Sequence, residues 1–177
     1  MSKKIAITGK PGCGKTTLCS RIFADFSDNS GGIITREIRK EGTRIGFQLE
    51  DLSTGEIGLL SHVDDCSGPS VGKYSVCLDQ LDSIANSAIQ TGLQESDLLI
   101  IDEIGPMELK SDNFIREVER SLEKKIDCLF TVHGKSRHPL LVKIRERFEL
   151  LELTRGNRDE LYRKLSQTFA ARDWSNN

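Results

Sequence analysis

The stretch GKPGCGKTT, residues 9–17, follows the apolar run Ile5–Ile7 and carries three glycines and two lysines. Its spacing, G-x-x-x-x-G-K-T, fits the phosphate-binding loop of nucleotide-binding proteins. Glycine allows successive backbone N–H groups to point at one anion without interference from a Cβ atom. The start of the following helix adds unpaired donors and a partial positive charge. The sequence therefore predicts a triphosphate-binding loop between a buried strand and a helix.

Several positions of this loop have an expected role. The Lys15 ammonium is expected to reach the β- and γ-phosphates and to take part in catalysis, and the Thr16 hydroxyl to ligate Mg²⁺. Lys10 stands at a position that the motif leaves open, so it is more readily explained as a solvated flank. The segment expected to surround the nucleotide comprises Gly9, Lys10, Pro11, Gly12, Cys13, Gly14, Lys15, Thr16 and Thr17.

A second motif, LLIIDEIG at residues 98–105, places two carboxylates after four apolar residues. Such an apolar run is typical of a strand buried on both faces. An aspartate at the end of a buried strand suits the Mg²⁺-holding position of a phosphate-loop protein, so Asp102 is predicted to bind the metal together with Thr16. Glu103 follows directly and is predicted to accept a proton from the attacking water.

Three residues outside these motifs are further candidates. His133, where a predicted strand ends, is placed to sense the γ-phosphate, although a polar residue is also ordinary there. Arg137 is a candidate arginine finger, and a solvated loop charge is the simpler explanation. Arg158, after the last predicted strand, is a candidate for stacking on the nucleotide base. The other histidines, His62 and His138, are expected at the surface. The three histidines of the chain do not have the spacing that is typical of a metal site.

Apolar periodicity predicts alternating strands and helices along most of the chain. A turn is predicted over residues 28–32, and the helix that begins at Cys77 is expected to end at Gly92. Ser111 or Asp112, and later Asn157, are expected to cap helices. Strands are predicted over 4–8, 33–39, 44–52, 56–61, 98–101, 127–132 and 148–153, and helices over 16–26, 77–90 and 139–147 and around the apolar stripes 114–122 and 161–169.

This alternation implies an α/β fold in which a mostly parallel sheet is covered by helices. The polar segment from about residue 39 to residue 63 is interpreted instead as an antiparallel hairpin appended to that sheet. At 177 residues, the chain is expected to form one domain, residues 1–177, around a single sizeable core.

Composition limits the classes of partner. The chain has 37% hydrophobic and 29% charged residues, and its formal net charge of −2 gives no general attraction to nucleic acid or to anionic membranes. The first residues hold too few apolar side chains for a signal peptide. A cytoplasmic location is expected from the cysteine content, and a monomer is the default expectation because no sequence feature indicates an oligomer. Five scattered cysteines without a CxxC pair indicate free thiols rather than a disulfide framework or a zinc site.

Five segments together resemble a known family: ITGKPGCGKTTL (7–18), GGIITREIRKEGTRIGFQLEDL (31–52), VGKYSV (71–76), IIDEIGPMEL (100–109) and LTRGNRDEL (153–161). The family is that of the small nucleoside triphosphatases, which includes thermophilic archaeal and bacterial enzymes and the human cancer-related nucleoside triphosphatase. The resemblance covers nearly the whole chain and implies a three-layer phosphate-loop α/β sandwich with an added strand between the strands of the two nucleotide motifs. It also implies Mg²⁺-dependent hydrolysis of several nucleoside triphosphates, with Asp102 positioning Mg²⁺ and Glu103 activating water.

The leading hypothesis is hydrolysis of ATP, GTP and other nucleoside triphosphates to the diphosphate and phosphate. A nucleotide or small-molecule kinase is the first alternative, and it is disfavoured because the candidate lid, residues 134–139, is short and holds one arginine. A slow nucleotide-dependent switch is the second alternative. The guanine-reading motif Asn-Lys-x-Asp is absent from the sequence, but sequence alone does not separate a switch from a slow hydrolase.

Overall fold

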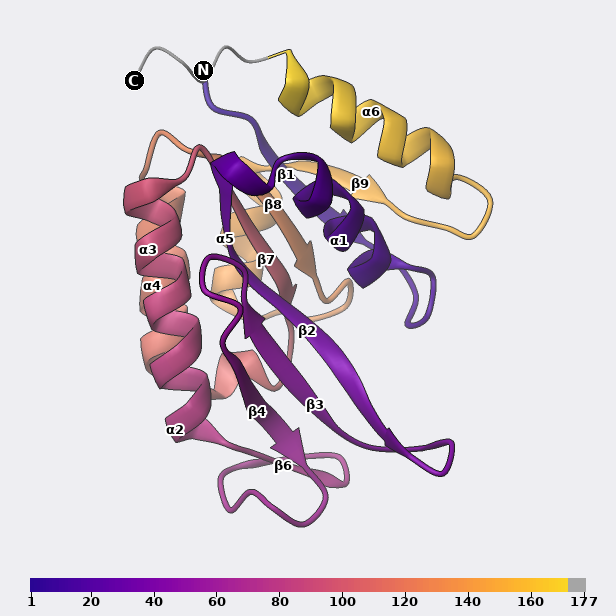
Figure 1. Ribbon diagram of the computed structural model, residues 1–177, viewed down its shortest axis with the longest axis vertical. Helices are drawn as coiled ribbons and strands as arrows, with labels where there is room; N and C mark the ends of the chain where they lie inside the picture. Colours follow the sequence, from indigo (N-terminus) through magenta and orange to yellow (C-terminus); the bar gives the residue numbers. More distant parts are fainter. Residues whose placement is uncertain (172–177) are drawn as a thin grey trace.

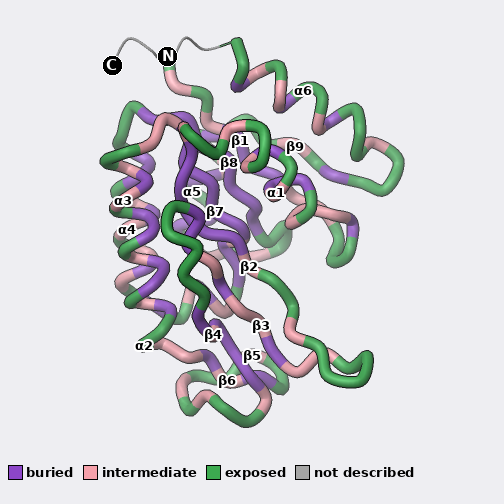
Figure 2. The backbone as a smooth tube through the Cα atoms, viewed as in Figure 1, coloured by how far each residue is buried: buried purple, intermediate pink, exposed green. Residues whose placement is uncertain are grey.

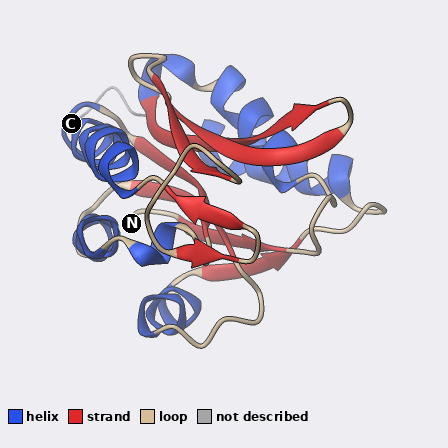
Figure 3. Ribbon diagram, turned by 90° about the horizontal axis from the view of Figure 1, so that it is seen from below, coloured by secondary structure: helices blue, strands red, loops and turns tan. Residues whose placement is uncertain are grey.

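The computed structural model describes residues 1–171 of the 177. A nine-stranded sheet runs through this part of the chain, in the order β5-β6-β4-β3-β2-β7-β8-β1-β9. Helices lie on both faces of the sheet, so the molecule has three layers (Figure 1, Figure 3).

The elements alternate along the chain much as the apolar periodicity predicts. The strands are β1 Lys4–Thr8, β2 Ser30–Lys40, β3 Thr43–Asp51, β4 Ile57–His62, β5 Ser70–Val71, β6 Tyr74–Val76, β7 Leu98–Ile104, β8 Asp127–Val132 and β9 Glu149–Glu152. The helices are α1 Lys15–Asp25, α2 Leu78–Gln80, α3 Asn86–Glu95, α4 Asp112–Leu122, α5 Pro139–Arg147 and α6 Arg158–Ala170, with 3₁₀ turns η1 Ser27–Asn29 and η3 Glu108–Lys110 and a π-helical turn η2 Leu81–Ala85. No helix within residues 1–171 is both long and apolar enough to cross a lipid bilayer.

The central strands are parallel. Strand β1 pairs with β8 and β9, and β7 pairs with β8 and β2, all in parallel register. Strand β8 therefore lies between β1 and β7, which carry the two nucleotide motifs. This arrangement confirms the predicted three-layer sandwich with an added strand. Because parallel strands end at a common edge, the residues that follow β1, β7 and β8 lie near one another.

Each face of the sheet has its own apolar core, because side chains alternate along a strand. Helices α3, α4 and α5 cover one face with buried residues such as Ile89, Phe114 and Ile144. Helices α1 and α6 cover the other face, where Ile22 and Phe169 are buried. Figure 2 shows the central strands as the most continuously buried part of the chain.

The antiparallel part of the sheet begins inside β2. Residues 30–34 of this strand pair with β7, while the following residues pair with β3 alone. Strand β3 pairs with β4, β4 with β6, and β6 with β5, all antiparallel. We name residues 35–48 the β2–β3 arm, which projects from the sheet to an exposed tip (Figure 1, Figure 2).

The turn predicted over residues 28–32 is wrong in its second half, since β2 already begins at residue 30. Gly32 has a φ of 117°, and a Cβ atom there would collide with the carbonyl oxygen of Ile100. A Cβ atom on Gly31 would lie 3.1 Å from the Cα atom of Gly92, and α3 continues past Gly92. These glycines permit a close approach of helix and strands, so they do not mark a turn or a helix end.

The predicted helix caps have different outcomes. Ser111 caps α4 as predicted, because its hydroxyl oxygen accepts a hydrogen bond from the backbone N–H of Phe114 at 3.0 Å. Asn157 occupies the N-cap position of α6 as predicted, but its side chain accepts from the backbone N–H of Thr154 at 2.8 Å and donates to the carbonyl of Glu152 at 2.9 Å. The Asn157 side chain therefore closes the turn that precedes α6 and makes no capping hydrogen bond to the helix.

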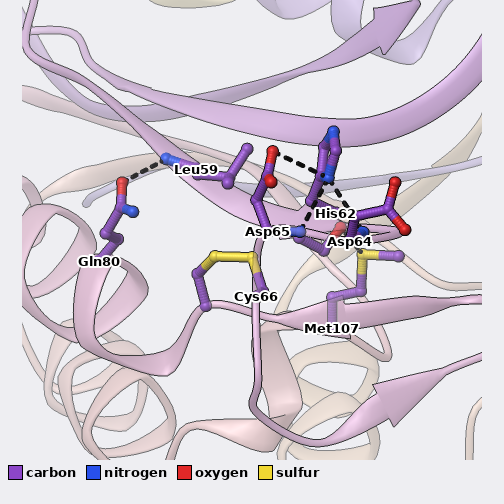
Figure 4. Close-up of a disulfide and its surroundings, with 9 residues drawn as sticks. Leu59, His62, Asp64, Asp65, Cys66, Gln80 and Met107 are labelled. Atoms are coloured by element: carbon purple, nitrogen blue, oxygen red, sulfur yellow. Dashed lines mark hydrogen bonds and ion pairs between the residues drawn. A yellow bond between two sulfur atoms is a disulfide. The ribbon is translucent and has the colours of Figure 1, made fainter.

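The expectation that all five cysteines are free is wrong. Cys66 and Cys77 form a disulfide, with their Cα atoms 5.0 Å apart (Figure 4). The pairing of β6 with β4 brings the chain back on itself, so that the backbone N–H of Cys77 donates to the carbonyl of Leu60 at 2.9 Å. His62, expected at the surface, is buried next to this segment, and its Nδ1 accepts the backbone N–H of Asp65. The three remaining thiols, those of Cys13, Cys19 and Cys128, are free and buried.

The Cys66–Cys77 disulfide is expected to stabilise the fold by about 3 kcal/mol, because it closes a short loop in the unfolded chain. Urea unfolding of the double variant Cys66→Ser/Cys77→Ser should show a free energy of unfolding lower by about that amount. The parent in dithiothreitol should match the variant, and the variant should not respond to the reductant. Equal unfolding midpoints for the oxidised parent and the variant would contradict the assignment.

Candidate active site

The glycine-rich loop joins β1 to α1 in a conformation that requires glycine at three positions. Gly9, Gly12 and Gly14 have φ values of 156°, 75° and 108°, which side-chain-bearing residues rarely adopt. A Cβ atom on Gly9 would also lie 2.5 Å from the carbonyl oxygen of Leu153. Gly14 occupies the N-cap of α1 and offers no side-chain cap. The first N–H groups of the helix therefore have no side-chain cap as acceptor, as an anion site requires.

Lys15 opens α1 and lies back across the loop. Its ammonium group donates to the carbonyl of Gly9 at 2.7 Å and to the carbonyl of Lys10 at 3.2 Å. The ammonium is thus held against the loop by two backbone oxygens. A cation in this place adds positive charge to the ring of N–H donors, which suits a phosphate chain.

Asp102 is the buried carboxylate of the site, with 1% of its surface exposed. The Thr16 hydroxyl donates to its Oδ2 at 2.7 Å, and the Thr131 hydroxyl donates to its Oδ1 at 2.6 Å. Burial raises the pKa of Asp102, whereas the hydrogen bonds from Thr131 and Thr16 lower it. One carboxylate therefore connects α1, β7 and β8 at the edge where the parallel strands end.

The residues around Asp102 fit a magnesium ion. Within residues 1–171, no three His, Cys, Asp or Glu side chains converge in a way that could hold a metal by themselves. Mg²⁺ prefers oxygen ligands and is usually held by one or two protein oxygens together with water and substrate phosphates. The adjacent Thr16 hydroxyl and Asp102 carboxylate are such a donor pair.

Two further carboxyl groups follow Asp102. Burial and the negative charge of Asp102 raise the pKa of Glu103, whose side chain lies over Gly105. Glu108 in η3 is 3% exposed, and its Oε2 accepts the backbone N–H of Gly105 at 3.1 Å. Burial, with the nearby charge of Glu103, raises the pKa of Glu108 to about 8. Sequence reasoning missed Glu108, because only the turn at Gly105 shows that it returns toward Glu103.

The three weaker candidates lie in different environments. Arg158 reaches the loop: its Nε donates to the carbonyl of Cys13 at 2.6 Å. His133 follows β8 at the same sheet edge as Asp102 and has an exposed side chain, and Arg137 is exposed in the next loop. Their roles toward a nucleotide stay predictions. Arg145 on α5 fixes this loop by donating to the carbonyl of His133 at 2.8 Å.

A cleft of about 790 Å³ adjoins the glycine-rich loop on the side of α6. Four arginines contribute to its lining, and sequence reasoning identified only Arg158 among them. Arg21 is held over the ring of Tyr162 at 3.6 Å, and Arg155 stands in the turn between β9 and α6. The lining residues of the cleft include Gly12, Gly14, Thr17, Arg21, Arg155, Arg158 and Arg163. The cleft is large enough for the base and sugar of a nucleotide.

A glycine-rich loop at a helix start, facing a buried aspartate on a parallel strand, defines a phosphate-loop nucleotide-binding protein. Residues 4–166 match the NTPase family, and the chain belongs to that family. This confirms the resemblance seen in the sequence and identifies the chain as an enzyme of the nucleoside-triphosphatase class.

Similar proteins cover almost the whole chain. The nucleoside-triphosphatase THEP1 of Methanosarcina acetivorans is 47% identical over 170 residues, which are 94% of this chain and 96% of that protein. The THEP1 of Archaeoglobus fulgidus is 42% identical over 166 residues, 93% of this chain and 97% of the relative. The crystal structure of THEP1 from Aquifex aeolicus has a TM-score of 0.85 at 30% identity, covering 93% of this chain and 97% of its own. The solution structure of a human cancer-related nucleoside triphosphatase has a TM-score of 0.76 at 31% identity, covering 97% and 100%.

The substitution Glu108→Gln is expected to change how stability depends on pH. The pKa of Glu108 is raised from its ordinary value of 4.5 to about 8, so the folded protein retains a proton that the unfolded chain releases. The contribution of this carboxyl group to the free energy of unfolding is complete below pH 4.5, and it is lost as the pH rises toward 8. Glutamine keeps an oxygen for the N–H of Gly105 and carries no charge. The free energy of unfolding of the variant minus that of the parent should therefore rise by at least about 1 kcal/mol from pH 5 to pH 8.

Urea unfolding at both pH values measures this difference. Glu95→Gln, at an exposed position of α3, is the matched control and should follow the parent. A Glu108→Gln variant whose difference from the parent is the same at both pH values would refute a buried, proton-holding Glu108.

Proposed function

We propose that the protein uses Mg²⁺ to hydrolyse nucleoside 5'-triphosphates of several bases, including ATP and GTP, to the diphosphate and inorganic phosphate. The observation that carries the proposal is the 2.7 Å hydrogen bond between Thr16 and Asp102. This bond joins the start of α1, the helix that follows the phosphate loop, to the Asp102 carboxylate of β7. Glu103 is the next residue of that strand. Phosphate binding, metal binding and a proton acceptor thus belong to one continuous site.

The loop and Lys15 bind the triphosphate in this proposal. The N–H groups after Gly9 and at the start of α1 donate to phosphate oxygens, and the Lys15 ammonium exchanges its backbone carbonyls for the β- and γ-phosphates. Thr16 and Asp102 would hold Mg²⁺, which when bound supplies neutralisation of the phosphate charge. The protein contributes to catalysis by fixing Lys15, Thr16 and Asp102 in place before the substrate binds, because these residues stand on a helix and a paired strand.

Glu103 is the proton acceptor in this mechanism. A water molecule attacks the γ-phosphorus, its oxygen forms the new bond, and the bond to the bridging oxygen of the diphosphate breaks. Glu103 takes the proton that the water loses. Burial and the charge of Asp102 raise the pKa of Glu103, which makes its carboxylate a better base near neutral pH.

Broad base specificity is supported by the chemistry of the cleft next to the loop. Its lining includes glycines and, beside Asp159 and Glu160, the guanidinium groups of residues such as Arg155 and Arg158. A guanidinium plane stacks on any base, because every base has an aromatic face. Arg158 is therefore proposed to contact the base, as the sequence position after β9 suggested.

Glu103→Gln is expected to lower kcat by about 10²–10⁴-fold, because the amide cannot accept the proton. Nucleotide affinity should stay within about threefold of the parent, since the loop and Lys15 are intact. Phosphate release and equilibrium binding of a nonhydrolysable ATP analogue give the two readouts. Glu95→Gln serves as the control, and parental turnover in the Glu103→Gln variant would remove this residue from the mechanism.

Phosphate release from ATP, GTP, CTP, UTP and ITP tests base specificity and the metal together. We expect kcat/KM values within about tenfold of one another, because stacking and phosphate binding do not read base edges. Chelation of Mg²⁺ with EDTA should stop release, and added Mg²⁺ should restore it. A single active base, or equal rates in EDTA, would contradict the corresponding part of the proposal. Transfer of the phosphate to an acceptor other than water would favour a kinase.

A further inference from the structure

Strand β2 runs past the site instead of ending there. Ile34 is its last residue in register with β7, and it pairs with Asp102. The backbone of the next residue, Thr35, also lies close enough to the Asp102 carboxylate to lower its pKa. At about 3.3 Å per residue, Arg36 lies about 7 Å beyond Ile34, on the side toward which the parallel strands end. The β2–β3 arm thus begins directly at the carboxylate that is proposed to hold Mg²⁺.

The alternation of side chains places Arg36 on the α1 face of the sheet. Ile34 packs with α1 residues such as Ile22, whereas Ile33 belongs to the core on the opposite face. Asp102 also points to the α1 face, because it bonds to Thr16. The first irregularity in the pairing of β2 with β3 occurs after Ile38, so the alternation holds through Arg36. Arg36 therefore shares a face with Asp102 and with the start of α1.

Arg36 is weakly held. Its ion pair within residues 1–171 is with Glu50, at 3.5 Å between Nε and Oε2, and 44% of the Arg36 side chain is exposed. An exposed pair at this distance contributes less than about 1 kcal/mol. The guanidinium group can therefore exchange this partner for a stronger anion at small cost, in contrast to a residue in a buried pair.

We infer that Arg36 contacts the γ-phosphate of the bound nucleotide and stabilises the charge that develops on it during hydrolysis. This inference rests on the proposed function. Lys15 is one cation at a site that also holds the carboxyl groups of Asp102 and Glu103, so a second cation offsets their repulsion of the phosphate. A guanidinium group can bind two phosphate oxygens at once. Arg36 stands on a paired strand, whereas Arg137, the arginine finger predicted from the sequence, stands in an exposed loop.

The same strand provides a matched control. Arg39 is 53% exposed and forms an ion pair with Glu37 at 2.7 Å, and Arg44 on β3 pairs with Glu37 at 2.9 Å. Glu37 is the neighbour of Arg36 in the regular part of β2, so its side chain points to the opposite face. Arg39 and its partners are therefore directed away from the α1 face. Loss of Arg39 changes the charge of the arm as much as loss of Arg36 does.

The test compares Arg36→Ala, Arg36→Lys and Arg39→Ala. Arg36→Ala should lower kcat by at least about 100-fold, as for loss of one preorganised donor to the transition state. Arg36→Lys should recover part of this loss, because it restores the charge without the two-point contact. Arg39→Ala should stay within about threefold of the parent. Circular dichroism and thermal unfolding verify that the variants fold.

Binding provides a second readout that does not depend on turnover. For each protein, the Kd for ADP is divided by the Kd for the nonhydrolysable analogue AMPPNP. This ratio should be at least about tenfold higher for the parent than for Arg36→Ala. In Arg39→Ala, this ratio should stay within about twofold of the parent. If both arginine variants behave alike in turnover and in the Kd ratio, the inference about Arg36 is overturned. If the parent itself releases no phosphate, the proposed hydrolysis fails, and the Kd ratio still decides whether Arg36 contacts the γ-phosphate.

Discussion

The Asp102 carboxylate is the group on which the rest of the site depends. A buried carboxylate is costly unless its oxygens are hydrogen-bonded, and here hydroxyl groups from α1 and β8 satisfy one oxygen each. These hydrogen bonds thereby fix the N-terminal end of α1, which follows the phosphate loop, over the sheet. The same oxygens suit a hard cation, so a contact that orders the apo site also prepares it for metal and nucleotide.

Close backbone contact fixes β2 beside that carboxylate. Without a Cβ atom, Gly32 passes against the carbonyl of Ile100, and Gly31 allows α3 to approach at Gly92. These contacts leave little freedom for β2 to slide along β7. The pairing of Ile34 with Asp102 follows from them, and so does the place of Arg36. Packing at one end of the strand thus decides which side chain stands over the nucleotide site at the other end.

Local patterns predicted the loop, Asp102 with its strand, and most helices, because each is specified by residues close in sequence. The predicted strand over residues 127–132 and the predicted helix over 139–147 match the structure residue for residue. The failures concern contacts between distant segments. Glycines at residues 31, 32 and 92 serve close approaches that no local window contains, and Cys66 meets Cys77 only because β6 returns to β4. Glu108 and Arg36 were likewise recognised only when a turn and a strand register placed them beside Asp102 and Glu103.

The contact between Arg158 and the carbonyl of Cys13 spans 145 positions of the chain. Strand β1 lies between β8 and β9, and α6 packs beside α1. The phosphate loop is therefore translated long before the segments that surround it. During synthesis, β1 and α1 remain without most of their native neighbours. The nucleotide-binding centre is accordingly completed only after α6 has been made, which is later than the disulfide-bonded segment and the β2–β3 arm.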